Sequence, residues 1–102
     1  MITIIIPAYN EENRILNSLN KIVNYFKDDY EIIVVDDGST DDTRKLVEEF
    51  DNVIINEKRR NMGKGYSIRQ GVSMASGELI LITDADLSTP ITDYEKLNNY
   101  ID

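Results

Sequence analysis

Three short apolar runs constrain the fold of this chain more than any other feature of the sequence. They cover residues 2–6, 31–35 and 78–82, and apart from Thr3, Glu31 and Glu78 they contain only aliphatic side chains. Strands that are apolar on both faces belong to parallel sheets, because helices must cover both sides of such a sheet. The runs therefore predict an α/β fold in which parallel strands alternate with helices.

Acidic residues follow each of these runs. The segments are Asn-Glu-Glu at 10–12, Asp-Asp-Gly-Ser at 36–39 and Asp-Ala-Asp at 84–86. Ligands of open α/β sheets bind beyond the carboxyl ends of the strands. An edge lined with carboxylates repels anions by itself, so it implies a bound cation. The pattern therefore predicts a metal-assisted site for a phosphate-bearing ligand.

The composition narrows the class of metal and of partner. The chain has 102 residues, which predicts a single domain over 1–102, and its formal net charge is −8. An acidic surface does not attract nucleic acid or an anionic membrane. The sequence contains no cysteine and no histidine, so oxygen atoms must hold any metal, which favours Mg²⁺ or Mn²⁺. The absence of cysteine fits a cytoplasmic protein, and no apolar run approaches the ~20 residues of a membrane span.

Helical spacing of apolar residues places the remaining elements. We expect helices over residues 11–27, shortly after residue 40, over 64–76 and over 92–101, with a further short strand at 52–56. Ser39 or Thr40 is expected to cap the second helix, whose first turn carries acids that suit the helix dipole. Leu46, Val47 and Phe50 are expected to form the inner face of that helix.

The third predicted helix has a weaker apolar pattern than the first. Ile68, Val72 and Ala75 are expected on its inner face, and Gly77 is placed to end it. Arg69, one turn into this helix, can serve either as a ligand-binding cation or as a solvated surface charge.

The turn after the first run, residues 7–11, has two readings. No glycine precedes Gly38, which excludes the glycine-rich turn of dinucleotide-binding sites. Pro7, Ala8 and Tyr9 instead offer a stiff wall and an aromatic edge suited to a base or ribose. The alternative is an ordinary strand-to-helix turn with Asn10 as the N-cap.

The second and third segments also have alternatives. An aspartate at 36 or 37 can accept hydrogen bonds from a base N–H or from ribose hydroxyls, while Gly38 allows a sharp turn. The same residues suit a helix start for dipole reasons alone. In the basic segment 57–65, Lys64 lies between two glycines and is the better candidate for a diphosphate. Lys58 and Arg59 are more typical of a solvated loop.

The Asp-Ala-Asp segment at 84–86 is a weak motif by itself, because an aspartate-rich chain produces such a pair by chance. Its position directly after an apolar strand strengthens the functional interpretation. Two carboxylates one residue apart, where a strand ends, can reach a metal and the ribose of the same nucleotide.

Taken together, these segments resemble a known family. Residues 7–11, 34–41, 61–65, 77–78 and 84–86 are similar in order and spacing to the N-terminal half of inverting nucleotide-sugar glycosyltransferases of the GT-A fold, in the large second family. That family includes dolichyl- and polyprenyl-phosphate sugar synthases. Residues 63–71 and 86–90 look most like the dolichyl-phosphate glucose synthases. The resemblance implies a Rossmann-like nucleotide-binding sheet.

The resemblance also implies a role for each matched residue. Ala8, Tyr9 and Glu11 would line the base and ribose, Asp37 would bind the uracil edge, and Asp36 would shape the turn. Asp84 would contact the nucleotide, and Asp86 would ligate Mg²⁺ or Mn²⁺ at the diphosphate. The implied nucleotide-binding set is Pro7, Ala8, Tyr9, Glu11, Asp36, Asp37, Lys64, Asp84 and Ala85, with Asp86 as the metal ligand.

The activity implied is transfer of a sugar, with inversion, from a UDP-glucose type of donor to an acceptor such as a polyprenyl or dolichyl phosphate. Family members carry further sequence that builds the acceptor side, and no residue here can be assigned as a catalytic base. We therefore expect either a donor-binding part of a longer protein, inactive alone, or a natural short relative. The expected location is cytoplasmic, at the cytoplasmic face of a membrane for a longer product. An apolar surface on the last predicted helix would favour self-association.

Two other classes remain open from the residues. A phosphatase of the haloacid-dehalogenase type also uses an Asp-x-Asp pair after an apolar strand, but it needs a lysine and further acids downstream of that pair. A non-catalytic module that only binds nucleotide sugars would need the donor half alone.

Overall fold

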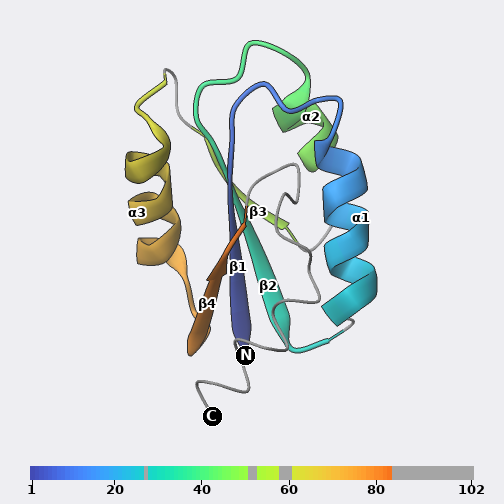
Figure 1. Ribbon diagram of the computed structural model, residues 1–102, viewed down its shortest axis with the longest axis vertical. Helices are drawn as coiled ribbons and strands as arrows, with labels where there is room; N and C mark the ends of the chain where they lie inside the picture. Colours follow the sequence, from blue (N-terminus) through green and yellow to red (C-terminus); the bar gives the residue numbers. More distant parts are fainter. Residues whose placement is uncertain (27, 51–52, 58–60, 84–102) are drawn as a thin grey trace.

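The computed structural model describes residues 1–26, 28–50, 53–57 and 61–83. In this part of the chain the strands are β1 (Ile2–Ala8), β2 (Tyr30–Asp36), β3 (Val53–Glu57) and β4 (Leu79–Ile82). The helices are α1 (Ile15–Phe26), α2 (Thr43–Val47) and α3 (Lys64–Met74). All strand pairs are parallel, and the order across the sheet is β3-β2-β1-β4 (Figure 1). The predicted parallel α/β fold is confirmed, whereas the helix predicted over 92–101 lies outside the described residues.

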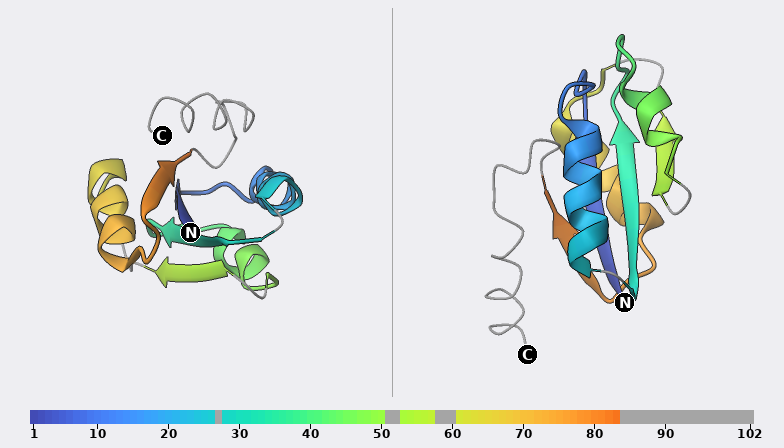
Figure 2. Two further views of the ribbon diagram at one scale, coloured as in Figure 1. Left: turned by 90° about the horizontal axis from the view of Figure 1, so that it is seen from below. Right: turned by 90° about the vertical axis from the view of Figure 1, so that its right-hand side faces the viewer.

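The helices form a layer on each side of the sheet. α1 and α2 cover one face and α3 covers the other, as the view along the sheet shows (Figure 2). On the α1 side, Ile4, Ile32 and Val34 belong to one fully buried cluster with Leu19 and Val47. Leu46 and Phe50 pack against that cluster. The three residues predicted for the inner face of the second helix therefore all contact the core, although Phe50 follows the end of α2.

The α3 side has a smaller core. Ile5, Ile33 and Val35 are fully buried, and Met74 and Ala75 pack against them. β1 and β2 are therefore buried on both faces, as the apolar runs predict. Within the described residues, no helix has the length and apolar character needed to cross a membrane.

The strand register aligns the carboxyl ends of the central strands. Ala8 at the end of β1 pairs with Asp36 at the end of β2, and Asp36 pairs with Glu57 of β3. β4 ends beside β1, where the N–H of Thr83 donates to the carbonyl of Ile5 (3.0 Å). We call this side of the sheet the carboxyl edge, and the side where the strands begin the amino edge.

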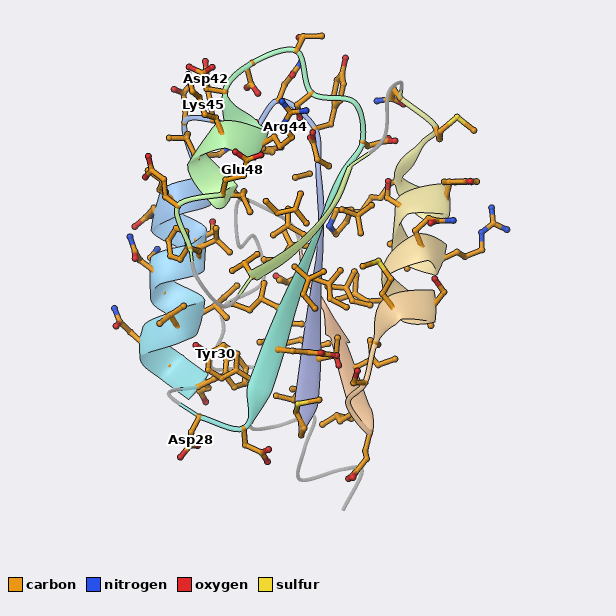
Figure 3. The ribbon with its side chains drawn as sticks, turned by 180° about the vertical axis from the view of Figure 1, so that it is seen from behind. Asp28, Tyr30, Asp42, Arg44, Lys45 and Glu48 are labelled. Atoms are coloured by element: carbon orange, nitrogen blue, oxygen red, sulfur yellow. The ribbon has the colours of Figure 1, made fainter. Side chains whose placement is uncertain are left out.

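The side-chain view separates the two edges. Asp42 lies near the carboxyl edge, whereas Asp28 and Tyr30 lie at the opposite end of the molecule (Figure 3). The loops that follow β1 and β2 both lie at the carboxyl edge, next to the loop that precedes α3 (Figure 1).

Two expectations about helix starts are wrong. α1 begins at Ile15 rather than at residue 11, after a turn closed by a hydrogen bond from the N–H of Ile15 to the carbonyl of Glu11 (2.9 Å). α2 begins at Thr43 after Asp42 and has no side-chain cap, so neither Ser39 nor Thr40 caps it. The side chains expected to cap helices bond across to the neighbouring loop instead.

The inner face of α3 also differs from its prediction. Ser67 and Gly71 are buried, whereas Val72 is exposed. A Cβ atom at position 71 would lie 2.6 Å from Ile5 Cγ2, so the helix approaches β1 through its glycine. Gly77 does not end the helix, because α3 ends at Met74 and Ala75 is already extended.

β4 is less buried than its apolar sequence indicates. Leu79 and Leu81 are half-buried, whereas Ile80 and Ile82 are exposed on the α3 side. Within the described residues β4 pairs with β1 alone, because it is an outermost strand in the order of the sheet. Burial on both faces is therefore confirmed for the central strands and wrong for this strand.

Candidate functional site

The turn after β2 is built by Asp36. Its carboxylate accepts hydrogen bonds from the N–H of Ser39 (3.3 Å) and from the Ser39 hydroxyl, and only 3% of the residue is exposed. Gly38, between them, has a φ of +81°, a conformation that glycine adopts without a steric penalty. The turn therefore depends on one buried carboxylate and one glycine.

Asp37 connects this turn to the loop before α3. Its carboxylate accepts hydrogen bonds from the N–H groups of Met62 (2.8 Å) and Gly63 (3.0 Å), and its own N–H donates to the carbonyl of Ala8 (2.8 Å). A carboxylate that is 96% buried needs such charge-assisted partners. Asp37 thus fixes the start of α3, and with it Lys64, against the ends of β1 and β2.

The loops after β1 and β2 are joined by reciprocal hydrogen bonds. The N–H of Asn10 donates to Ser39 Oγ (2.9 Å), and the N–H of Thr40 donates to Asn10 Oδ1 (2.8 Å). Asn10 reaches this position with a φ of +52°, which asparagine tolerates better than most residues. Asn10 is therefore a link between loops and not an N-cap.

A second reciprocal pair lies beside the first. The N–H of Glu12 donates to Asp41 Oδ2 (3.2 Å), and the N–H of Asp42 donates to Glu12 Oε2 (3.0 Å). Each loop thus supplies backbone donors to carboxylate acceptors of the other loop. We call residues 10–12 and 39–43, with these bonds, the clasp.

Thr43 lies at the buried centre of the clasp. Its hydroxyl accepts a hydrogen bond from the N–H of Glu11 (2.8 Å) and donates to Asp41 Oδ1, and the residue is fully buried. Partial burial raises the pKa of Asp41, but the hydrogen bonds from Thr43 and from the N–H of Glu12 outweigh it and hold that pKa below its ordinary value. Asp41 therefore stays ionised and acceptor-only at neutral pH.

The other predicted site residues of the first turn lie at the same edge. Ala8 is buried, Pro7 is half-buried and Tyr9 is 44% exposed, so its ring is available at the surface. The carboxylate of Glu11 is held through Oε2 by the guanidinium of Arg14 (2.6 Å). Asp84, Ala85 and Asp86 lie outside the described residues. The structure thus brings the segments at 7–11, 36–43 and 61–64 together.

No cluster of three acidic side chains that could hold a metal occurs among the described residues. The carboxylates of Asp36, Asp37 and Asp41 are engaged by hydrogen bonds within and between the loops. Asp84 and Asp86 follow the end of β4 by two and four residues in the sequence. The metal role predicted for Asp86 concerns a residue outside the described part of the chain and stays a prediction.

Sequence reasoning missed the roles of Asn10, Asp41 and Thr43. From the sequence alone, Asn10 was interpretable only as the N-cap of the helix that follows it. Asp41 was interpretable only as a charge that suits the dipole of the next helix. Their partners are about 30 positions away in the sequence. The available signal was the concentration of short polar acceptors in two loops that the parallel sheet brings to one edge.

The fold is a parallel α/β sheet with loops gathered beyond the carboxyl ends of its strands, the place where open sheets of this class form their ligand sites. Residues 3–102 match glycosyl transferase family 2. The chain belongs to this family, and its sheet is the GT-A sheet of these enzymes.

Similar proteins agree with this assignment. A dolichyl-phosphate beta-glucosyltransferase of Trichomonas vaginalis is 38% identical over 112 residues, covering 98% of this chain and 35% of the relative. The chain thus spans about a third of the length of the curated relatives that it matches. Family membership decides against the phosphatase alternative.

Two solved structures are informative because of their ligands. The 1–349 fragment of Staphylococcus aureus TarS in complex with UDP has a TM-score of 0.81 and 29% identity, covering 97% of this chain and 32% of that one. The mannosyltransferase PcManGT of Pyrobaculum calidifontis, in complex with GDP-mannose and Mn²⁺, has a TM-score of 0.78 and 33% identity, covering 98% and 31%.

Proposed function

We propose that this chain binds a nucleoside diphosphate sugar, with UDP-glucose as the preferred type, and forms the donor-binding domain of a glycosyltransferase. The observation that carries the proposal is the assembly of three motif segments at the carboxyl edge. Asp37 ties the loop at Met62 and Gly63 to β2, while the clasp ties the loop after β1 to the loop after β2. Each of these segments lies within residues 3–102, which match the family.

The proposed roles follow from exposure and position. Tyr9 presents an exposed ring at the end of β1, beside the half-buried Pro7 and the buried Ala8, and this surface suits a base or ribose. Lys64 is the exposed first residue of α3. A cation at a helix N-terminus favours a diphosphate.

Asp37 and Glu11 have a narrower range of roles than the sequence alone indicates. Asp37 already accepts two backbone hydrogen bonds, and Glu11 is bound by Arg14 through one carboxylate oxygen. We propose that Glu11 offers its other oxygen to a ribose hydroxyl. Asp37 would contact the base edge while it keeps the loop before α3 in place.

A divalent cation fits the chemistry of this site. The chain has no histidine or cysteine, and Asp84 and Asp86 supply the hard oxygen ligands that Mg²⁺ and Mn²⁺ prefer. We propose Asp86 as the metal ligand, with Asp84 and Ala85 at the nucleotide. The cation would neutralise charge on the departing nucleoside diphosphate.

For the acceptor we propose a polyprenyl or dolichyl phosphate, in keeping with the names of the related transferases. A phosphate oxygen of the acceptor would form a bond to the anomeric carbon while the bond to the diphosphate breaks. The bonding electrons leave with the nucleoside diphosphate. One in-line displacement of this kind inverts the anomeric centre, and an anionic phosphate needs no base to attack.

Calorimetric titration tests the donor proposal. Uridine diphosphate should bind this chain in the presence of Mn²⁺, and EDTA should weaken that binding by roughly tenfold or more, since a metal ligand is at stake. Asp86→Ala should reproduce the affinity seen in EDTA. Asp28→Ala is the matched control, because it removes the same charge from an exposed residue at the amino edge and should leave affinity unchanged.

Each possible result of this titration has a defined meaning. Equal affinity with and without EDTA would contradict the metal role of Asp86. Failure of UDP, GDP and their sugars to bind under any condition would contradict donor binding itself. Tight binding without sugar transfer by a longer gene product would favour the non-catalytic binding module.

A further inference from the structure

We propose that Thr43, through the clasp, is a positioning residue for nucleotide binding. It would hold the loop that carries Tyr9 and Glu11 at a fixed distance from the turn that follows Asp36 at the end of β2. This inference rests on the proposed donor function and adds to it a residue that touches no ligand.

The Thr43 hydroxyl acts as acceptor and as donor at the same time. It accepts a hydrogen bond from the N–H of Glu11 and donates one to Asp41, so it needs both a lone pair and a proton. Of the residues of similar size, serine retains both functions and valine retains neither. In Thr43→Val the N–H of Glu11 loses its partner next to a fully buried position.

The side chains of Asn10, Ser39 and Thr40, which the sequence suits to helix capping, bond between the two loops instead. α2 has no side-chain cap, and α1 begins only at Ile15, beyond the clasp. Asn10 adopts a positive φ, which is uncommon outside glycine, in order to take part. Capping by Ser39 or Thr40 and a relaxed backbone at Asn10 are thus given up for bonds between the loops, while Asp41 still accepts a hydrogen bond from the N–H of Thr43 at the start of α2.

The two loops that the clasp joins form part of the proposed nucleotide site. Asn10, Glu12 and Thr40 are exposed, and exposed loops of this length are ordinarily mobile. Loops that are ordered before a ligand arrives lose less conformational entropy when it binds. The hydrogen bonds that Thr43 makes in the clasp therefore contribute to affinity although Thr43 itself does not contact the ligand.

A matched control lies at the amino edge. The hydroxyl of Thr3 donates to Glu31 Oε1 (2.6 Å) and accepts a hydrogen bond from the N–H of Gly77 (2.8 Å). Thr3 is fully buried, like Thr43, and bridges a carboxylate and a backbone N–H in the same way. It lies far from the proposed ligand, so Thr3→Val reports the purely structural effect of the same deletion.

The experiment compares UDP affinity, with Mn²⁺ present, in the chain and in Thr43→Val, Thr43→Ser and Thr3→Val. Thr43→Val should bind UDP about tenfold more weakly, because loops that the clasp no longer orders must be ordered when the ligand binds. Thr43→Ser should restore most of that affinity. Thr3→Val should match Thr43→Val in lost stability towards urea but bind UDP as the unchanged chain does.

A second pair of variants covers the case in which Thr43→Val does not fold. Asn10→Gly removes the acceptor of the Thr40 N–H but keeps the positive φ, and Asp29→Gly is its control, because Asp29 also has a positive φ (+55°) and lies at the amino edge. Asn10→Gly should weaken UDP binding severalfold, whereas Asp29→Gly should not.

Three results would overturn the inference. Unchanged affinity in Thr43→Val or, where that variant is unfolded, in Asn10→Gly would refute it and leave donor binding intact. Equal loss in Thr43→Val and Thr3→Val would show a general effect of stability. Absence of UDP binding by the unchanged chain would remove the donor function, and the inference with it.

Discussion

Both edges of the sheet contain the same hydrogen-bonding arrangement around a threonine, but it has a different role at each edge. At each edge a fully buried threonine hydroxyl bridges a backbone N–H and a carboxylate: Thr43 joins Glu11 to Asp41, and Thr3 joins Gly77 to Glu31. Both carboxylates are only partly buried, and both have a lowered pKa. What differs is the structure that is joined.

At the amino edge this arrangement joins β1 and β2 to the connection between α3 and β4. The N–H of Ser76 also donates to Glu31 (2.5 Å), and the N–H of Glu78 donates to the carbonyl of Met1 (3.0 Å). At the carboxyl edge it joins the loops after β1 and β2, in which Asn10, Glu12 and Thr40 are exposed. The same hydrogen-bonding pattern thus stabilises the fold at the crowded amino edge and positions surface loops at the carboxyl edge.

The largest expected effect is on stability and comes from crowding at the amino edge. A Cβ on Gly77 would lie 2.7 Å from the backbone N of Thr3 and 2.9 Å from the carbonyl O of Met1, and backbone atoms cannot easily move aside. Gly77→Ala should therefore lower the free energy of unfolding by about 3 kcal/mol, the upper part of the range for overpacking. Urea denaturation monitored by circular dichroism measures this change.

Gly65→Ala is the control for that prediction. Among the described residues, apart from its chain neighbours and the backbone of its own helix, no heavy atom lies within 4 Å of a Cβ at position 65, which is in the first turn of α3. Alanine should there raise stability by up to about 1 kcal/mol through helix propensity. A Gly77→Ala protein as stable as the unchanged chain would show that the amino edge is not crowded, and the contrast between the edges would fail.

A smaller effect is expected from acid. Burial raises the pKa of Glu31, but hydrogen bonds from the Thr3 hydroxyl and from the N–H groups of Ser76 and Gly77 outweigh it, so the folded-state pKa lies below its ordinary value. A depressed pKa contributes stability that is present above the unfolded-state pKa and is lost as the pH falls through the folded-state pKa. The contribution should thus disappear as the pH falls below about 4.

Urea titrations at pH 7 and pH 3 measure this contribution. Glu31→Gln should be less stable than the unchanged chain at pH 7, and the difference should shrink at pH 3. Asp41→Asn should behave in the same way, because its pKa shift has the same sign and the same kind of cause. A difference that stays constant or grows on acidification would contradict the assigned hydrogen bonds.

The sequence predicts the sheet well because its signal is local. Runs such as residues 31–35 are apolar on both faces, and this pattern is sufficient for β2 to be buried between layers of helices. Val72 was misplaced because a single apolar residue does not reveal that α3 packs through Gly71 onto Ile5. Exposure of β4 depends on its place in the strand order, which no residue within the strand encodes.

The site is predictable in its location but not in its internal bonds. The carboxyl-edge rule brings together Ala8, Asp37 and Lys64 without any knowledge of coordinates. The bonds of Asn10 and Thr43 depend on which amide meets which oxygen across two loops, and the register of β1 against β2 decides this. The roles of Asp84 and Asp86 stay predictions.

The central claim is that the carboxyl edge binds a nucleotide while the amino edge serves the fold, and amide hydrogen exchange measured residue by residue tests it most directly. On addition of UDP and Mn²⁺, the amides of Glu11, Thr40 and Met62 should exchange more slowly. The amides of Ser76 and Gly77, which are bonded at the amino edge, should change no more than the rest of the sheet. Slowing at Ser76 and Gly77 with none at Glu11 and Met62 would contradict the account.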